Sequence, residues 1–176
     1  MDELNRYVQN PDFPYYISTF KNHNLLKKPV IRALKKSNSE YINKKNEVLI
    51  TNWYQASDKI DEYLHILYEP LNNHMNEVFA KLKHTNYEYQ SFWFTKYKKN
   101  GTFTIHQHRK ASWVSIYYLK LPGGTPITHF ENIFSREIFV PNIKEGDIIT
   151  FPGFVWHYSP INTSSKTKIV VSFNVD

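Results

Sequence analysis

The chain has 176 residues, a net charge of +6 and no cysteine. This length fits one domain, so we expect a single domain over residues 1–176. The lack of cysteine excludes disulfide scaffolds, zinc–cysteine modules, iron–sulfur clusters and thiol nucleophiles, and any metal must have nitrogen and oxygen ligands. The polar N-terminal segment does not look like a signal peptide, and no apolar run approaches the length of a membrane span. We therefore expect a cytoplasmic protein that does not bind membranes.

The positive charge is concentrated in an early segment, residues 21–45. Its basic residues are Lys21, Lys27, Lys28, Arg32, Lys35, Lys36, Lys44 and Lys45. Only Glu40 and the nearby Glu47 offset them. Such a patch could face phosphate, nucleic acid or another anionic partner. The alternative is a solvated surface in a lysine-rich chain, and composition fits both interpretations.

The first half, residues 1–87, is predicted to be mainly helical and to support the second half. Residues 24–36 place apolar side chains at roughly helical spacing. Residues 58–83 give the clearest helix, because apolar residues recur at every third or fourth position and acidic residues begin the segment. Pro70 is predicted to kink or break this helix. His74, beside the apolar stripe, is expected to lie at the edge of the core.

The second half, residues 88–176, is predicted to form β-strands. Its apolar segments are short, rich in aromatic and β-branched residues, and separated by turn signals that contain glycine or proline. The candidate strands are residues 89–97, 102–108, 112–120, 126–130, 136–140, 146–151, 154–158 and 167–174. Many short strands without helices between them predict antiparallel sheets. We expect a mainly β fold with N-terminal helices, a double-stranded β-helix (jelly-roll or cupin-like) core, and helix 58–83 covering one sheet.

Three histidines of the second half indicate a metal site. His106 and His108 lie two residues apart on a predicted strand, where such side chains share one face, so both imidazoles could bind one ion. His157 comes much later, but a jelly roll brings distant strands together. With imidazole ligands and no thiolate, iron with open coordination positions is favoured. The alternative is that His106 and His108 are an ordinary pair of surface or core residues.

Longer motifs give these histidines a context. They are TKYKKNGTFTIHQH, which ends at His108, SWVSIYYLKLPGGTPITHF, and GDIITFPGFVWHYSPINTSSKTKIVVSFN, which contains His157. Over residues 93–174 they resemble 2-oxoglutarate/Fe(II)-dependent oxygenases, and the stretch ending in Trp53 also falls in the expected order. The nearest resemblance is to a group of small oxygenases of this type from marine bacteria and their phages, related to the prolyl 4-hydroxylases.

The resemblance implies roles for particular residues. His106 and His157 match the two histidine ligands of the iron. Lys168 matches the basic residue that pairs with the distal carboxylate of 2-oxoglutarate. Tyr97 and Tyr118 match positions that often line the cosubstrate pocket. A lysine suits this role as a point charge, although arginine is the usual choice because its planar fork binds a carboxylate through two hydrogen bonds.

The third metal ligand departs from the common pattern of the family. In the common triad a carboxylate stands two residues after the first histidine, and His108 occupies that position here. His-x-His is also the pattern of the small-oxygenase group, so we expect three histidine ligands, His106, His108 and His157. The alternative is a carboxylate ligand, Glu131 or Asp147, with His108 behind it.

The resemblance implies an enzyme, a non-haem Fe(II)- and 2-oxoglutarate-dependent dioxygenase acting as a hydroxylase. Dioxygen and 2-oxoglutarate would be consumed, and succinate and carbon dioxide released. Related folds act on peptidyl residues, small metabolites or nucleobases, and the sequence does not choose among these substrates. The same resemblance implies the cytoplasm of a bacterium or of a phage-infected cell. Two alternatives stay open: a cupin-like three-histidine metalloprotein that does not use 2-oxoglutarate, and a catalytically silent jelly-roll module.

Overall fold

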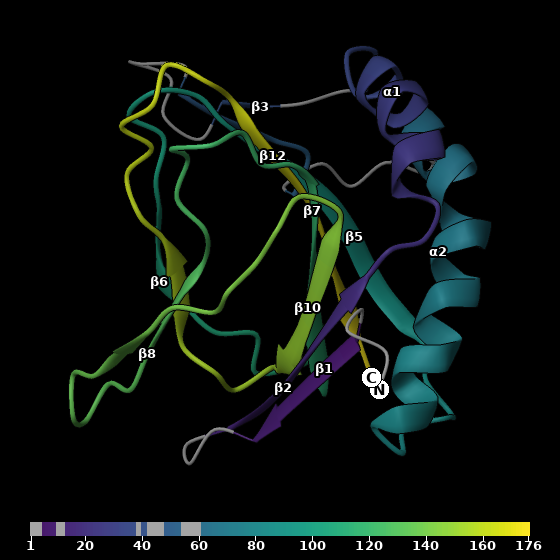
Figure 1. The fold of residues 1–176 in the computed structure, drawn as a ribbon, viewed down its shortest axis with the longest axis vertical. Coiled ribbons are helices and arrows are strands. Elements are labelled where there is room, and N and C mark those ends of the chain that lie inside the picture. Colours follow the sequence, from purple (N-terminus) through teal and green to yellow (C-terminus); the bar gives the residue numbers. More distant parts are fainter. Residues whose placement is uncertain (1–4, 10–12, 38–39, 42–47, 54–60) are drawn as a thin grey trace.

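The computed structural model describes residues 5–9, 13–37, 40–41, 48–53 and 61–176. Within these residues, two antiparallel sheets face each other, and two helices cover the outer face of the larger sheet (Figure 1). The arrangement confirms the predicted mainly β, jelly-roll type of fold. In this part of the chain, neither helix combines the length and the apolar character that crossing a membrane requires.

The larger sheet runs in the order β1-β2-β10-β7-β12-β5-β4-β3, and the smaller in the order β6-β11-β8-β9. The strands of the larger sheet are β1 (Asn5–Gln9), β2 (Pro14–Thr19), β3 (Glu40–Tyr41), β4 (Leu49–Thr51), β5 (Tyr89–Tyr97), β7 (Trp113–Lys120), β10 (Asp147–Pro152) and β12 (Lys168–Val175). Those of the smaller sheet are β6 (Phe103–His106), β8 (His129–Glu131), β9 (Ile138–Phe139) and β11 (His157–Ser159). The helices are α1 (His23–Ala33) and α2 (Glu62–Lys81).

The central strands of the larger sheet are buried on both faces, and their alternating side chains separate two cores. On β7, Tyr117 packs toward the helices, whereas Ile116 packs in the space between the sheets. β12 alternates in the same way, with Val171 in the helix-side core and Val170 in the inner one. This alternation places Lys168, two residues before Val170, on the inner side of the sheet.

Helix α2 lies where the apolar pattern of residues 58–83 predicts it, within the described residues that begin at 61. The centre of its apolar stripe, including Leu67 and Leu71, is fully buried against the larger sheet. Pro70 lies inside one continuous helix, so the predicted break is wrong. A proline inside a helix costs about 3 kcal/mol, and burial of the neighbouring leucines offsets a cost of that size.

The prediction of a mainly helical first half is incomplete. β1, β2, β3 and β4 all come from residues 1–87 and join the larger sheet, where β2 pairs with β10. The overlooked signal is the run Tyr15-Tyr16-Ile17, which is aromatic and β-branched and is buried on both faces of the sheet.

The predicted strands of the second half are all present, but those of the smaller sheet are shorter than predicted. The segment 102–108 forms a strand only over Phe103–His106, and 154–158 forms one that begins at His157. The four second-half strands of the larger sheet, β5, β7, β10 and β12, match their predicted bounds within one residue, because long ladders extend them.

Candidate metal centre

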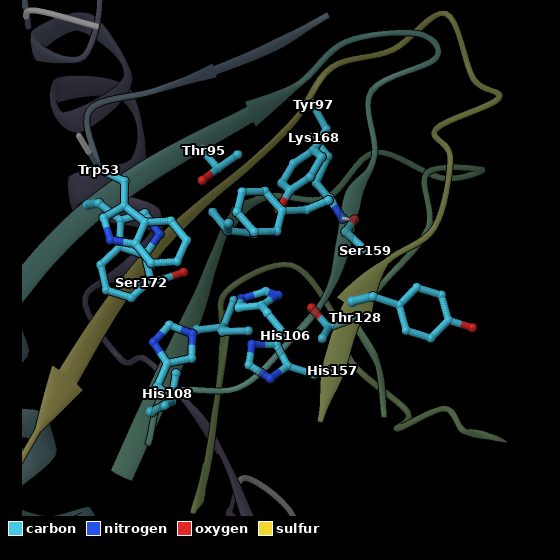
Figure 2. Close-up of a pocket in the computed structure, with 16 residues that line it drawn as sticks. Trp53, Thr95, Tyr97, His106, His108, Thr128, His157, Ser159, Lys168 and Ser172 are labelled. Atoms are coloured by element: carbon cyan, nitrogen blue, oxygen red, sulfur yellow. Dashed lines mark hydrogen bonds between the residues drawn. The ribbon is translucent and has the colours of Figure 1, made fainter. Parts of the chain in front are cut away.

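The smaller sheet brings three histidines together. His106 ends β6 and lies opposite His157, which begins β11, and His108 follows two residues after β6. One nitrogen of each ring lies within 4.8 Å of the others, and Figure 2 shows the three rings grouped at one end of a cavity. Among the residues that the structure describes, no other group of three or more His, Cys, Asp or Glu side chains is placed to hold a metal ion.

A bulge in β6 aims His106 into the cavity. The paired residues are His157 with His106 and Ser159 with Phe103, so three steps on β6 match two steps on β11. On a regular strand, residues three apart face opposite sides. The extra residue of the bulge lets Phe103 and His106 both line the cavity.

His108 is held by a close approach of two turns. Its N–H donates to the carbonyl oxygen of Gly153 at 2.8 Å. A Cβ atom at residue 153 would lie 2.0 Å from the carbonyl oxygen of Ala111 and 2.6 Å from that of His108. Only glycine therefore allows the turn before β11 to pack against the turn that carries His108.

Hydrogen bonds orient two of the rings so that an unprotonated nitrogen points toward the cavity. Nδ1 of His106 donates to the carbonyl oxygen of Thr104 at 2.8 Å, and Nδ1 of His157 donates to that of Val155 at 3.0 Å. Nε2 of each ring then keeps its lone pair, the form in which imidazole binds a metal. Nε2 of His108 is buried without a hydrogen-bond partner, a costly state that a bound metal would relieve.

Burial keeps the three imidazoles neutral. It lowers the pKa of His108 to about 4 and also lowers the pKa values of His106 and His157. All three rings are therefore uncharged at pH 7 and can bind a metal without first losing a proton. Metal–nitrogen bonds are about 2.0–2.1 Å long, so small side-chain rotations bring the three nitrogens around one ion. The residues present fit a transition metal with nitrogen ligands.

Lys168 lies at the other end of the same cavity (Figure 2). It is only 1% exposed, and burial lowers its pKa to about 7. Nζ donates to Ser159 Oγ at 2.7 Å and to the carbonyl oxygen of Pro126 at 2.9 Å, and it lies 4.1 Å from the ring centre of Tyr97. No acidic side chain is among the described residues that line the cavity. An ammonium has three N–H donors, so one remains for a ligand.

No family model and no curated protein matches the sequence, but solved structures match the fold. An oxidoreductase of the 2OG-Fe(II) oxygenase family from Burkholderia pseudomallei gives a TM-score of 0.72 at 8% identity, over 92% of this chain and 84% of its own. The viral collagen prolyl hydroxylase of Paramecium bursaria Chlorella virus-1 gives a TM-score of 0.57 at 15% identity, over 99% of this chain and 96% of its own. HygX from Streptomyces hygroscopicus, with nickel, 2-oxoglutarate and hygromycin B bound, gives a TM-score of 0.68 at 6% identity, over 92% of this chain and 82% of its own. The fold is that of the 2-oxoglutarate–Fe(II) oxygenases.

Within this oxygenase fold, the structure separates the two tyrosines that the sequence grouped together. Tyr97 lines the cavity beneath Lys168. Tyr118 lies one layer behind the wall, because its hydroxyl donates to Thr128 Oγ1 at 2.9 Å and accepts the N–H of Thr128 at 3.1 Å. Thr128 therefore lines the cavity in the place predicted for Tyr118.

The two carboxylates considered as third ligands both lie outside the cavity of the oxygenase fold. Glu131 accepts a hydrogen bond from Arg136 Nη1 at 3.0 Å. Asp147 accepts bonds from Thr19 Oγ1 at 2.7 Å and from the N–H of Lys144 at 2.9 Å. Of the three candidates for the third ligand, only His108 is placed with His106 and His157.

Three side chains of the site had no role assigned from the sequence. Trp53 lines the cavity from two residues beyond the end of β4; the resemblance placed its stretch in the expected order but gave it no contact with the histidines. Thr128 belongs to a motif of the resemblance but was not singled out. Ser159 could have been found, since it lies two residues after His157 and so shares its face of the strand.

The basic segment 21–45 is partly neutralised by acids from elsewhere in the chain. The ion pairs are Lys21 with Glu77, Lys27 with Glu145 and Lys36 with Glu62. Lys44 and Lys45 lie outside the described residues. An anionic partner at this segment stays a prediction.

Proposed function

We propose that the protein is a non-haem Fe(II)- and 2-oxoglutarate-dependent dioxygenase that hydroxylates its substrate. One observation carries the proposal: a three-histidine cluster and the buried ammonium of Lys168 occupy opposite ends of one cavity. The fold supports it, because solved structures of 2-oxoglutarate–Fe(II) oxygenases share this architecture.

His106, His108 and His157 would hold Fe(II) and leave further coordination positions open. The bound iron, with dioxygen and 2-oxoglutarate, supplies the oxidation of the keto acid to succinate and carbon dioxide and the hydroxylation of a substrate C–H bond. The chain contributes three neutral nitrogens in a water-poor setting. Because no carboxylate adds negative charge, we expect weaker Fe(II) binding than in the common triad, and competition from copper, nickel and zinc.

Lys168 would bind the distal carboxylate of 2-oxoglutarate, with the Ser159 hydroxyl beside it. A buried ammonium without an anion is costly, and a ligand carboxylate supplies the missing charge. The cavity now holds about 30 Å³, room for about one or two water molecules. Binding of the cosubstrate therefore requires side chains that line the cavity to shift.

The other two functional hypotheses explain less of the site. A cupin-like metalloprotein that does not use 2-oxoglutarate gives no reason for a buried ammonium opposite the metal site. A catalytically silent module gives no reason for three neutral histidines converging with bare nitrogens. Both observations together favour the dioxygenase.

The substrate is proposed to be one of three classes: a peptidyl residue, a small metabolite or a nucleobase. Structural neighbours support the first two, since one is named a collagen prolyl hydroxylase and another was solved with hygromycin B. The cytoplasm of a bacterium or a phage-infected cell remains the proposed location.

The test is anaerobic addition of Fe(II) and then 2-oxoglutarate to the purified protein. We expect a weak visible charge-transfer band that needs both additions and is absent from His157→Ala. Iron binding without a band after 2-oxoglutarate would instead support the cupin-like hypothesis. A protein that binds neither would support the silent module.

A further inference from the structure

The three histidines are not held in the same way. His106 and His157 each donate a hydrogen bond from Nδ1 to the carbonyl oxygen two residues earlier. His108 makes no such bond to a backbone carbonyl, and its Nε2 has no hydrogen-bond partner, although the Asn174 side chain also acts on its ring. Since an imidazole can rotate about its side-chain bonds, something else must set the plane of the His108 ring.

Aromatic rings surround His108. The indole of Trp53 lies almost parallel to the imidazole, with 5.6 Å between ring centres and 8° between planes. Trp93 stacks on the same ring at 5.6 Å and 15°, and the two indoles stack on each other at 4.9 Å and 19°. Trp53 also lies 6.0 Å from the ring centre of His106, so it contacts two of the three histidines (Figure 2). Stacked geometries of this kind are favourable for aromatic pairs.

The backbone that carries Trp53 is fixed to the larger sheet. The N–H of Trp53 donates to Thr51 Oγ1 at 3.2 Å, and Thr51 Oγ1 donates to the carbonyl oxygen of Phe94 at 2.6 Å. The side-chain oxygen of Asn52 accepts the N–H of Phe94 at 2.8 Å. The indole therefore projects toward the smaller sheet from a rigid base.

We propose that Trp53 is a positioning residue for the metal centre: its indole holds the His108 ring in the plane that lets Nε2 bind the ion. The inference rests on the proposed function only in taking the three histidines as ligands of one metal. Trp53 does the work for His108 that a backbone carbonyl does for the other two. Trp93 is 5% exposed and belongs to strand β5, so its position in the stack is fixed by the sheet. Trp53 completes the stack from outside the strand.

The test measures metal binding rather than turnover. Co(II) is titrated into the purified protein and into Trp53→Leu and Trp53→Phe, and the visible spectrum of bound Co(II) reports its coordination. Trp53→Leu should bind Co(II) about tenfold or more weakly, the size expected when a group that orients a metal ligand is lost. Its spectrum should also change. Trp53→Phe keeps a ring to stack and should stay close to the wild type in both respects.

A double-mutant cycle separates positioning from general stability. In a His108→Asp background there is no imidazole to stack, so Trp53→Leu should no longer weaken Co(II) binding. Trp113→Leu is the matched control, because this tryptophan packs on the helix-side core and should lower the melting temperature without changing Co(II) binding. If Trp53→Leu does not fold, Trp53→Met replaces it in the same cycle.

Two results overturn the inference. One is a Trp53→Leu protein with wild-type Co(II) affinity and spectrum. The other is an equal loss of affinity in the His108→Asp background. Either leaves the three-histidine site standing, whereas a wild-type protein that binds no metal refutes the proposed function itself.

Discussion

The two ends of the cavity are built in different ways. The Lys168 end belongs to the larger sheet, where β12 pairs along its length with β5 on one side and β7 on the other. The histidine end belongs to strands of four and three residues and to the turns beyond them. A bulge, a close approach at Gly153 and the Trp53 stack place its ligands.

Because of this difference, substitutions at the two ends of the cavity should have different effects. Lys168 begins a strand in the middle of the larger sheet and pairs with Tyr97, so its backbone position does not depend on its side chain. Substitutions there should change ligand binding and leave metal binding unchanged. The histidine end depends on particular local contacts, as functional sites on turns and strand ends often do. Substitutions there should change metal binding while leaving the sheets intact.

The largest effect is expected from the metal ligands. His106→Ala and His157→Ala should each abolish stoichiometric iron, measured by elemental analysis after anaerobic reconstitution. His108→Ala should also lose the metal, whereas His108→Asp should retain or tighten it by restoring the common carboxylate triad. Circular dichroism should show all four variants folded.

Full iron occupancy in His108→Ala would refute the three-histidine site. The dioxygenase proposal itself would survive that result, with His106 and His157 as metal ligands.

A second substitution tests whether the packing of helix α2 stabilises the larger sheet. Leu71 on α2 is fully buried, and Leu71→Ala should lower the free energy of unfolding by about 2–5 kcal/mol. Chemical denaturation measures this change. Metal binding by the protein that remains folded should be unaffected, and an active-site defect without a change in stability would place α2 at the site.

Lys168→Met removes the charge at the other end of the cavity and keeps most of the volume. Loss of a charge-assisted hydrogen bond costs about 1.5–3 kcal/mol, so the dissociation constant of 2-oxoglutarate should rise about tenfold or more. Iron affinity should not change.

Calorimetric titration with 2-oxoglutarate checks this prediction. Equal binding in the wild type and the variant would remove Lys168 from its proposed role. The remaining candidates would then be Lys166, Arg109 and Arg136, none of which lines the cavity in this structure.

The sequence missed β1 to β4, but it predicted the bounds of β5, β7, β10 and β12 in the larger sheet better than those of the smaller sheet, for a physical reason. Buried strands must be apolar and β-branched, and this pattern is visible in strands such as β7 and β12. The histidine pair at positions 106 and 108 also stood out, but β6 ends at His106, so the turn beyond the strand and not strand alternation places His108. The bulge in β6 left no such pattern, because it depends on the pairing partner and not on local composition.

Long-range contacts explain what the sequence could not show. Trp53 meets His108 only because β4 pairs with β5 across the sheet. Tyr118 was expected to line the cosubstrate pocket, but its hydrogen bond to Thr128 holds it behind the residues that line the cavity. Pro70 was expected to kink or break α2, but the helix continues through it, because tertiary packing outweighed the local preference for a break.

The smallest effect concerns pH and involves the Lys168 end alone. The pKa of Lys168 without ligand is about 7 because of burial. A carboxylate bound to its ammonium raises that pKa, so above pH 7 binding takes up a proton and the affinity for 2-oxoglutarate falls as pH rises.

The charged fraction of a group with a pKa of about 7 falls about tenfold between pH 6 and pH 8. The dissociation constant should rise by a similar factor. Lys168→Arg remains charged throughout and should remove the pH dependence, whereas a level wild-type curve over this range would show that the lysine binds no carboxylate.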